Sequence, residues 1–178
     1  MRRPIGIAQH FRRFLSDTSG SPTVEFVIVF PMLIWVVFST FEIGWITTRQ
    51  VMLERGLNQT IRDLRLGRIA SPTHAGLKTL VCERSLILRD CETSIHIELI
   101  DMSLNTGLPQ ASVQCVDRTG VIDPILNFSN GIEEDIMFIR VCVIVDPLMP
   151  GMGIGTHLIK DASGGFAMVA FSAFKQEP

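Results

Sequence analysis

Residues 16–50, SDTSGSPTVEFVIVFPMLIWVVFSTFEIGWITTRQ, decide the fold of this chain. No charged residue lies between Glu25 and Glu42, and the apolar block from Val24 to Ile46 reaches the ~20 residues that cross a bilayer core. An acid near either edge of such a block can reach the lipid headgroups, so it costs less than an acid at the bilayer centre. The sequence therefore predicts a membrane-spanning helix at residues 21–47.

The helical pattern continues beyond the apolar block. Apolar residues recur at intervals of three or four and form one stripe, made of Leu53, Leu57, Ile61 and Leu64. No proline lies between Pro31 and Pro72, which predicts one helix over about residues 22–67, roughly 70 Å long, with a bend at Pro31. Residues 48–70 are thus an amphipathic continuation that needs a partner for its stripe. A juxtamembrane linker helix fits the same residues.

The remaining chain, residues 71–178, predicts a small folded head. A short second helix opens at Ser71 and Pro72. Alternating or continuously apolar runs then predict strands at residues 94–102, 136–145 and 166–174. The middle run is apolar enough for a central strand covered on both faces. Three or four antiparallel strands packed on the helix stripe give an α+β fold with a pilin-like head.

Charge is distributed unevenly along the chain. The leader, residues 1–20, holds four arginines and one aspartate, so it carries +3 and the remainder −5 of the net −2. This positive-inside bias predicts a cytoplasmic N-terminus and a head across the inner membrane, periplasmic or extracellular. An ordinary secretory signal is the rival interpretation, but no small-x-small cleavage site follows the apolar block.

A cleavage site ahead of the apolar block is a different matter. Gly20, followed by four residues and then by Glu25 and Phe26, resembles a prepilin processing site. Such sites are cut after the glycine on the cytoplasmic side, so Ser21 would become the first residue. The new amino group would give Glu25 a partner among packed helices, where a lone carboxylate is costly. The alternative is an acid at the membrane edge.

The four cysteines are even in number and none shows the C-x-x-C spacing of a metal or redox site. In an extracytoplasmic head they predict two disulfides, and three pairings are open. We prefer Cys82 with Cys91, which closes a short loop between helix and strand, and Cys115 with Cys142. The alternative is four buried free thiols. No metal site is predicted.

The sequence gives little support to an enzyme or a nucleic-acid-binding protein. It has no nucleophile elbow, no glycine-rich phosphate loop and no H-E-x-x-H motif, so neither catalysis nor a cofactor is predicted. The acidic head and the absence of tyrosine disfavour nucleic acid as a partner.

One turn-rich segment, residues 147–159, mixes apolar side chains with glycines. Its Met149, Met152 and Ile154 predict a contact surface for a neighbouring subunit or the membrane face. A loop folded back over the core explains the same residues.

Several segments together resemble the TadE/TadF family, the pseudopilin-like minor proteins of the bacterial tight adherence (Flp) pilus. They are the leader ending at Gly20, TVEFVIVFP, FEIGW, IRVCVIVDPLMPG and AFSAFKQEP. The resemblance covers both ends of the chain well and residues 71–134 poorly. It implies cleavage by a prepilin peptidase, with Gly20, Glu25 and Phe26 as the matching positions.

The resemblance further implies a non-enzymatic minor pseudopilin that assembles or primes a pilus and so supports cell adhesion. Its partners would be the lipid bilayer, the prepilin peptidase, other pilus or pseudopilin subunits and inner-membrane assembly proteins. The alternative is an uncleaved single-pass membrane protein whose periplasmic domain is a scaffold or adaptor in an envelope or secretion complex.

Overall fold

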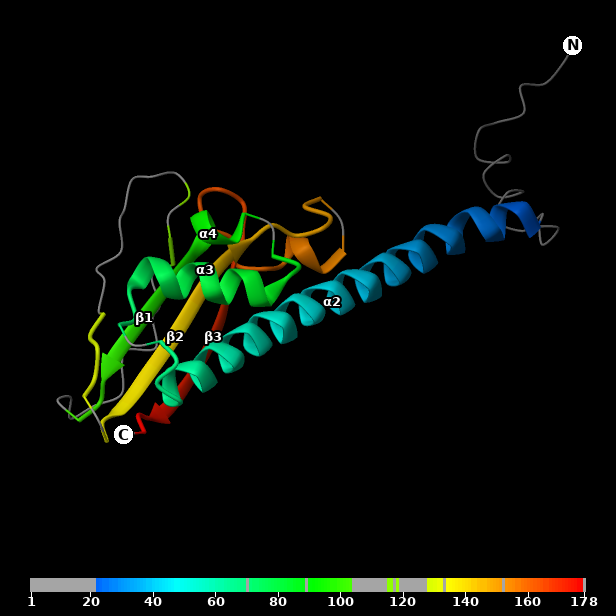
Figure 1. Cartoon of the computed structure of the whole chain (residues 1–178). Coiled ribbons are helices and arrows are strands. Elements are labelled where there is room, and N and C mark those ends of the chain that lie inside the picture. Colours follow the sequence, from blue (N-terminus) through cyan, green and yellow to red (C-terminus); the bar gives the residue numbers. More distant parts are fainter. Residues whose placement is uncertain are drawn as a thin grey trace, which may run out of the picture.

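The computed structural model describes most of the chain after residue 21. The described residues are 22–69, 71–88, 90–103, 115–116, 118, 128–132, 134–151 and 153–177. The leader at 1–20 lies outside them. A long helix carries a head made of a second helix and a three-stranded antiparallel sheet (Figure 1), so the predicted α+β class is confirmed.

The long helix α2 spans Pro22–Arg65 without interruption, and Pro31 lies inside it. Pro22 suits the first helical position because the N–H that proline lacks would have no partner there. Glu25 in the first turn and Arg62 in the last complement the helix dipole. Gly67, at a φ of 62°, donates its N–H to the Leu64 carbonyl and ends the helix. The single helix predicted from the sequence is therefore present.

The two halves of α2 have different surroundings. The predicted stripe is buried, from Leu53 at 0% exposure to Leu64 at 6%, and it belongs to the main hydrophobic core. Between Pro22 and Gln50, the only buried residue is Glu42. Figure 1 shows that the N-terminal half of α2 extends beyond the head, whereas the C-terminal half lies along it.

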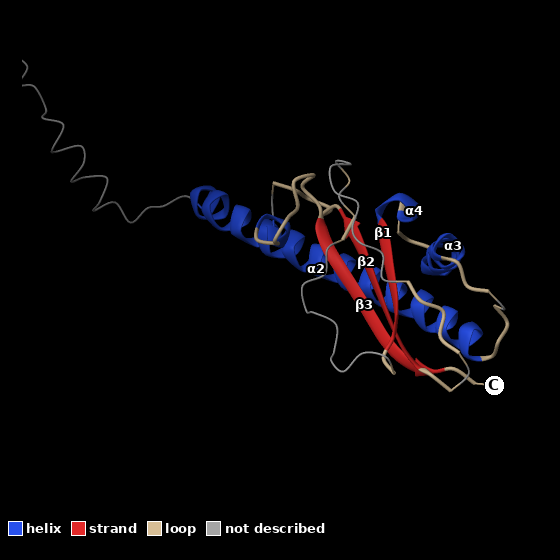
Figure 2. Cartoon of the chain, turned by 90° about the vertical axis from the view of Figure 1, so that its left-hand side faces the viewer, coloured by secondary structure: helices blue, strands red, loops and turns tan. Residues whose placement is uncertain are grey.

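The sheet has the order β1-β2-β3, with β1 at Ile95–Asp101, β2 at Ile136–Val145 and β3 at Phe166–Lys175. Its register places Ile97 opposite Val141 and Val141 opposite Ala170, and all three are buried. Helices α2 and α3 lie on one face of this sheet (Figure 2). The core thus forms between one sheet face and two helices.

The opposite face of the sheet is also buried at its centre. Glu98 of β1 is opposite Arg140 of β2, and the Arg140 Nε donates to the Glu98 carboxylate at 2.7 Å. Each residue is only 9% exposed. Burial of this ion pair supports the prediction that β2 is a central strand covered on both faces.

The second helix, α3, spans His74–Ser85, three residues later than the predicted opening at Ser71. Thr73 sets the start because its hydroxyl accepts a hydrogen bond from the Gly76 N–H at 3.1 Å. A one-turn helix α4, Cys91–Ser94, leads into β1.

Two disulfides connect segments within the head. Cys82 of α3 is bonded to Cys91 of α4, with 5.7 Å between their Cα atoms. Cys115 is bonded to Cys142 of β2, with 5.5 Å between the Cα atoms. These are the two pairs that the sequence favoured.

Candidate functional site

The N-terminal half of α2 presents apolar side chains on all sides. Most of its large residues are exposed, among them Ile28 at 66%, Met32 at 73% and Phe41 at 61%, whereas Ile34 and Phe38 are half buried. A helix of this length and composition can cross a membrane. The described structure therefore contains one candidate membrane span.

Two of the predicted processing residues, Glu25 and Phe26, lie in the first turns of this helix. Both are exposed, and the Phe26 ring stacks on Phe30 with 4.9 Å between ring centroids. Gly20 and Ser21 lie outside the described residues. Among the residues that the structure describes, no hydrogen bond or ion pair joins the Glu25 carboxylate to the head, so its role stays a prediction.

The clearest polar site on α2 is at Glu42, near the end of the apolar half. Glu42 is 1% exposed, and its carboxylate accepts hydrogen bonds from two backbone N–H groups of the loop after β2. The Gly155 N–H donates at 2.9 Å and the Met149 N–H at 3.3 Å. Bonds from N–H groups to a carboxylate are stronger than neutral ones, so they offset its desolvation.

Glycines make this close approach feasible. A β-carbon at Gly155 would lie 2.6 Å from the Glu42 Oε1, and one at Gly153 would lie 2.7 Å from the Oε2. Gly153 also has a φ of 74°, which side chains rarely adopt. Both glycines lie in η1, a short 3-10 helix at Gly153–Thr156. We call the contact of Glu42 with this loop the glutamate clasp.

The glutamate clasp changes the surroundings expected for Glu42, but not its place near the edge of the apolar block. The sequence predicts a carboxylate there that reaches the lipid headgroups. Instead the carboxylate is enclosed by the head, because backbone N–H groups replace the solvent that it would otherwise need. The glycine-alternating segment PGMGIG at 150–155 was the available signal, but sequence alone does not say which group such a segment approaches.

The predicted contact residues of the loop divide between two environments. Met149 and Ile154 are half buried, and Leu158 packs against the core. Leu148 is 43% exposed and Ile159 95% exposed. Met152 lies outside the described residues. The loop does fold back onto the helix, while a contact role for Met149, Met152 and Ile154 stays a prediction.

A cationic cluster lies within two helical turns of the clasp. The Arg49 guanidinium is 5.2 Å from the centre of the Trp45 ring and donates to the Asp146 carbonyl at 2.9 Å. The Asp146 carboxylate accepts two bonds from Arg118, at 3.0 and 2.6 Å. These bonds lower the pKa of Asp146 and raise that of Arg118. The cluster fixes the end of β2 to α2.

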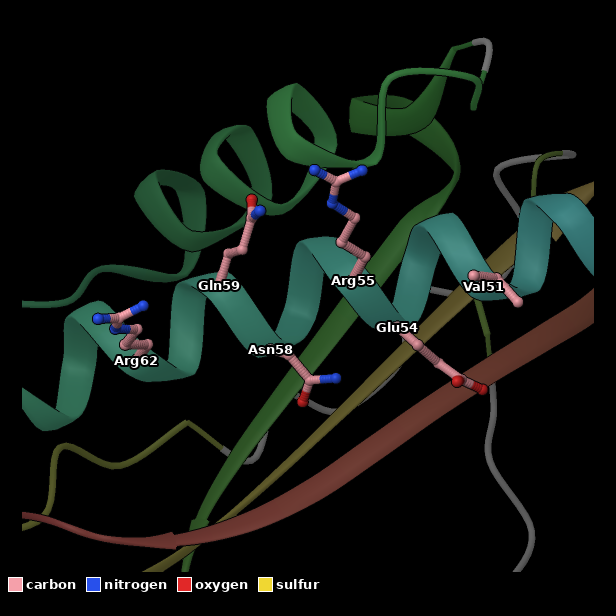
Figure 3. A pocket seen from close by; sticks show the side chains of 6 residues that line it. All are labelled: Val51, Glu54, Arg55, Asn58, Gln59 and Arg62. Atoms are coloured by element: carbon pink, nitrogen blue, oxygen red, sulfur yellow. The ribbon is translucent and has the colours of Figure 1, made fainter.

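The outward face of the C-terminal half of α2 is polar. Figure 3 shows six side chains from this one helix around a shallow hollow, namely Val51, Glu54, Arg55, Asn58, Gln59 and Arg62. They diverge from the helix and enclose no cavity. Within the described residues, no group of three or more His, Cys, Asp or Glu side chains could hold a metal ion.

These features define the class: they fit a membrane protein in which an apolar helix carries a disulfide-bonded α+β head. The family model described as TadE-like protein matches residues 20–62. The expected resemblance to this family is thereby confirmed over α2, and it relates the chain to tight adherence pilus systems. No curated protein and no solved structure matches the chain.

Proposed function

We propose that this protein is a minor pseudopilin of a tight adherence pilus, without enzymatic activity, that assembles or primes the filament. The observation that carries the proposal is the family match, which begins at Gly20 and covers α2 to residue 62. The matched range contains the glycine of the predicted processing site and the exposed apolar helix. A subunit of this kind needs both.

The exposed apolar half of α2 suits two successive environments. In the bilayer its side chains face lipid, and in a filament the same side chains would pack against neighbouring helices. Glu25 is the exception in the first turn, because a carboxylate among packed helices needs a partner. Cleavage after Gly20 would create an amino group at Ser21, four residues away.

The proposed location is the inner membrane, with the leader in the cytoplasm and the head in the periplasm. The four arginines before the helix support this orientation. Two disulfides in the head support it independently, because disulfides persist in oxidising compartments. The proposed partners are the bilayer, a prepilin peptidase and other pilus subunits.

The test is the mass of the protein isolated from its native membrane. The proposal expects an N-terminus at Ser21, and an intact Met1 terminus would instead support the uncleaved scaffold or adaptor protein. Gly20→Leu should retain the leader and abolish pilus formation. Glu54→Gln, at an exposed acid of the polar face, is the control that should leave both unchanged, whereas Glu25→Gln should reduce pilus formation after normal cleavage.

A further inference from the structure

The glutamate clasp lies at a defined height along α2. Glu42 follows Pro22 by 20 residues, which is ~30 Å of helix at 1.5 Å per residue. A bilayer hydrocarbon core is also ~30 Å thick. If the apolar half of α2 spans the bilayer, the clasp therefore lies at the outer boundary of the hydrocarbon core.

The clasp fixes a particular loop at this height. We call residues 147–160 the membrane-proximal loop, and Figures 1 and 2 show it as the part of the head nearest to the N-terminal half of α2. The Lys160 Nζ, at the end of the loop, donates to the carbonyl of Pro150 in its first part at 3.3 Å. The loop is thus held both to the helix and to itself.

The outer surface of this loop combines aliphatic and polar residues: Thr156 and His157 are exposed on it, and the Asp146 side chain just before it is 66% exposed. Leu148 and Ile159 are exposed, as are Pro150 and Gly151 between them in the chain. Trp45 and Arg49 of α2 lie within two turns of Glu42, and Lys160 closes the loop. Exposed aliphatic groups beside tryptophan and long cationic side chains are typical of the membrane–water interface.

The backbone of the loop is suited to contact with lipid. Exposed N–H and C=O groups are costly near hydrocarbon unless they have partners. Glu42 accepts from Met149 and Gly155, and the His157 N–H donates to the Ile154 carbonyl. The loop can therefore present side chains to lipid while these polar groups stay paired.

We propose that the membrane-proximal loop rests in the interfacial region of the outer leaflet, with Leu148 and Ile159 in contact with lipid. The occupant of this surface is the bilayer, because the surface is continuous with the lipid-facing half of α2. The contact would fix how the head is oriented against the membrane before a subunit leaves it. The proposal rests on the proposed function only in requiring that α2 spans the bilayer.

The test uses the full chain in vesicles of phosphatidylethanolamine and phosphatidylglycerol. Leu148→Cys, Ile136→Cys and Val36→Cys each carry an environment-sensitive nitrobenzoxadiazole label, and the native cysteines stay in their disulfides. Ile136 is the matched control: it is exposed at 54% and lies at the end of β2 that is distant from the loop. Val36, 55% exposed on the apolar half of α2, reports whether the helix spans the bilayer.

Lipids with a doxyl quencher near the headgroup should remove most of the fluorescence at Leu148 and leave that at Ile136 unchanged. Deep doxyl lipids should quench Val36. Equal quenching at Leu148 and Ile136, with Val36 quenched, would overturn the loop contact alone. The loop contact would also be overturned if the label at Leu148 were shielded from aqueous iodide but not quenched by the doxyl lipids, because protein rather than lipid would then cover it. An unquenched Val36 would overturn the spanning helix itself.

Discussion

The two halves of α2 share one continuous backbone but differ in what covers their side chains. Residues 22–41 are exposed except for the half-buried Ile34, Phe38 and Ser39, whereas residues 53–64 bury a stripe that begins with Leu53 at 0% exposure. Both halves contain large aliphatic residues, so composition alone does not separate them. The comparison shows that hydrophobic side chains on one helix can either face lipid or pack in a protein core.

Glu42 marks the boundary between the halves. On its N-terminal side most described residues are exposed and only Ile34, Phe38 and Ser39 are half buried, whereas on its C-terminal side β3 and α3 pack against the helix. A carboxylate at this point is compatible with the apolar half only because the head supplies its hydrogen bonds. Matched substitutions on the two sides of Glu42 test this boundary.

The largest expected effect is at the buried stripe. Leu53→Ala should lower the free energy of unfolding of the head by about 2–5 kcal/mol, because it leaves a cavity in the core. The measurement is equilibrium unfolding of the full chain in detergent micelles. Leu33→Ala is the matched change in the other half, where Leu33 is 54% exposed, and it should leave head stability unchanged. Equal losses at both positions would contradict the division of the helix.

A smaller loss is expected at the glutamate clasp. Glu42→Ala removes the acceptor of two backbone N–H groups, which should cost about 1–3 kcal/mol. Amide hydrogen exchange at Met149 and Gly155 should accelerate, while exchange in β2 changes little. Glu54→Ala, at an exposed acid bonded to Gln50, is the control. Unchanged exchange at Gly155 would show that Glu42 does not hold the loop.

The third prediction concerns the crossing of α2 and α3. A β-carbon at Gly56 would lie 3.0 Å from the Val81 carbonyl oxygen and 3.2 Å from the Ser85 nitrogen, and it would also meet the Ser85 hydroxyl. Gly56→Ala should therefore cost about 1–2 kcal/mol despite a better helix propensity. A β-carbon at Gly44 meets nothing within 4 Å, so Gly44→Ala should be neutral or slightly stabilising in the same unfolding assay. Stabilisation by both changes would contradict the close crossing.

The smallest expected effect is a pH dependence near the end of α2. Hydrogen bonds from Arg84 at 2.6 Å and Arg68 at 3.0 Å lower the pKa of Asp63. Because its pKa is lowered in the folded state, Asp63 stabilises the fold at pH values above its unfolded pKa of about 4. This stabilisation is lost as the pH falls through the folded pKa. Thermal unfolding of Asp63→Asn should thus depend less on pH below about pH 4 than that of the parent protein.

Arg84→Gln serves as the partner change for this prediction. It removes the main bond to Asp63, so it should weaken the same pH dependence, and the two changes together should add little to either alone. A full acid response in Asp63→Asn would assign the dependence to other carboxylates.

Local pattern was sufficient for much of the fold. The spacing of Leu53, Leu57, Ile61 and Leu64 identified the buried stripe because helical periodicity is set by the backbone. The strand at 136–145 was placed correctly because its apolar run needs cover on both faces. The start of α3 was placed too early because Thr73, rather than Ser71, supplies the cap.

The glutamate clasp could not be derived in this way. Glu42 and Gly155 are 113 residues apart, and no local rule links a carboxylate to a distant loop N–H. The PGMGIG segment indicates that something approaches the backbone closely, but not what approaches it. The same limit applied to the loop residues Met149 and Ile154, for which a contact surface and a folded-back loop were equally consistent with the sequence.

The sequence by itself determined the elements: an uncharged helix long enough for a bilayer, its amphipathic continuation, and short apolar strands. These depend on local backbone periodicity and on the transfer of side chains out of water, which each segment carries with it. Only the tertiary structure decided where the head begins on the helix. That boundary depends on which distant N–H groups reach Glu42, and such long-range pairing exists only once the chain has folded.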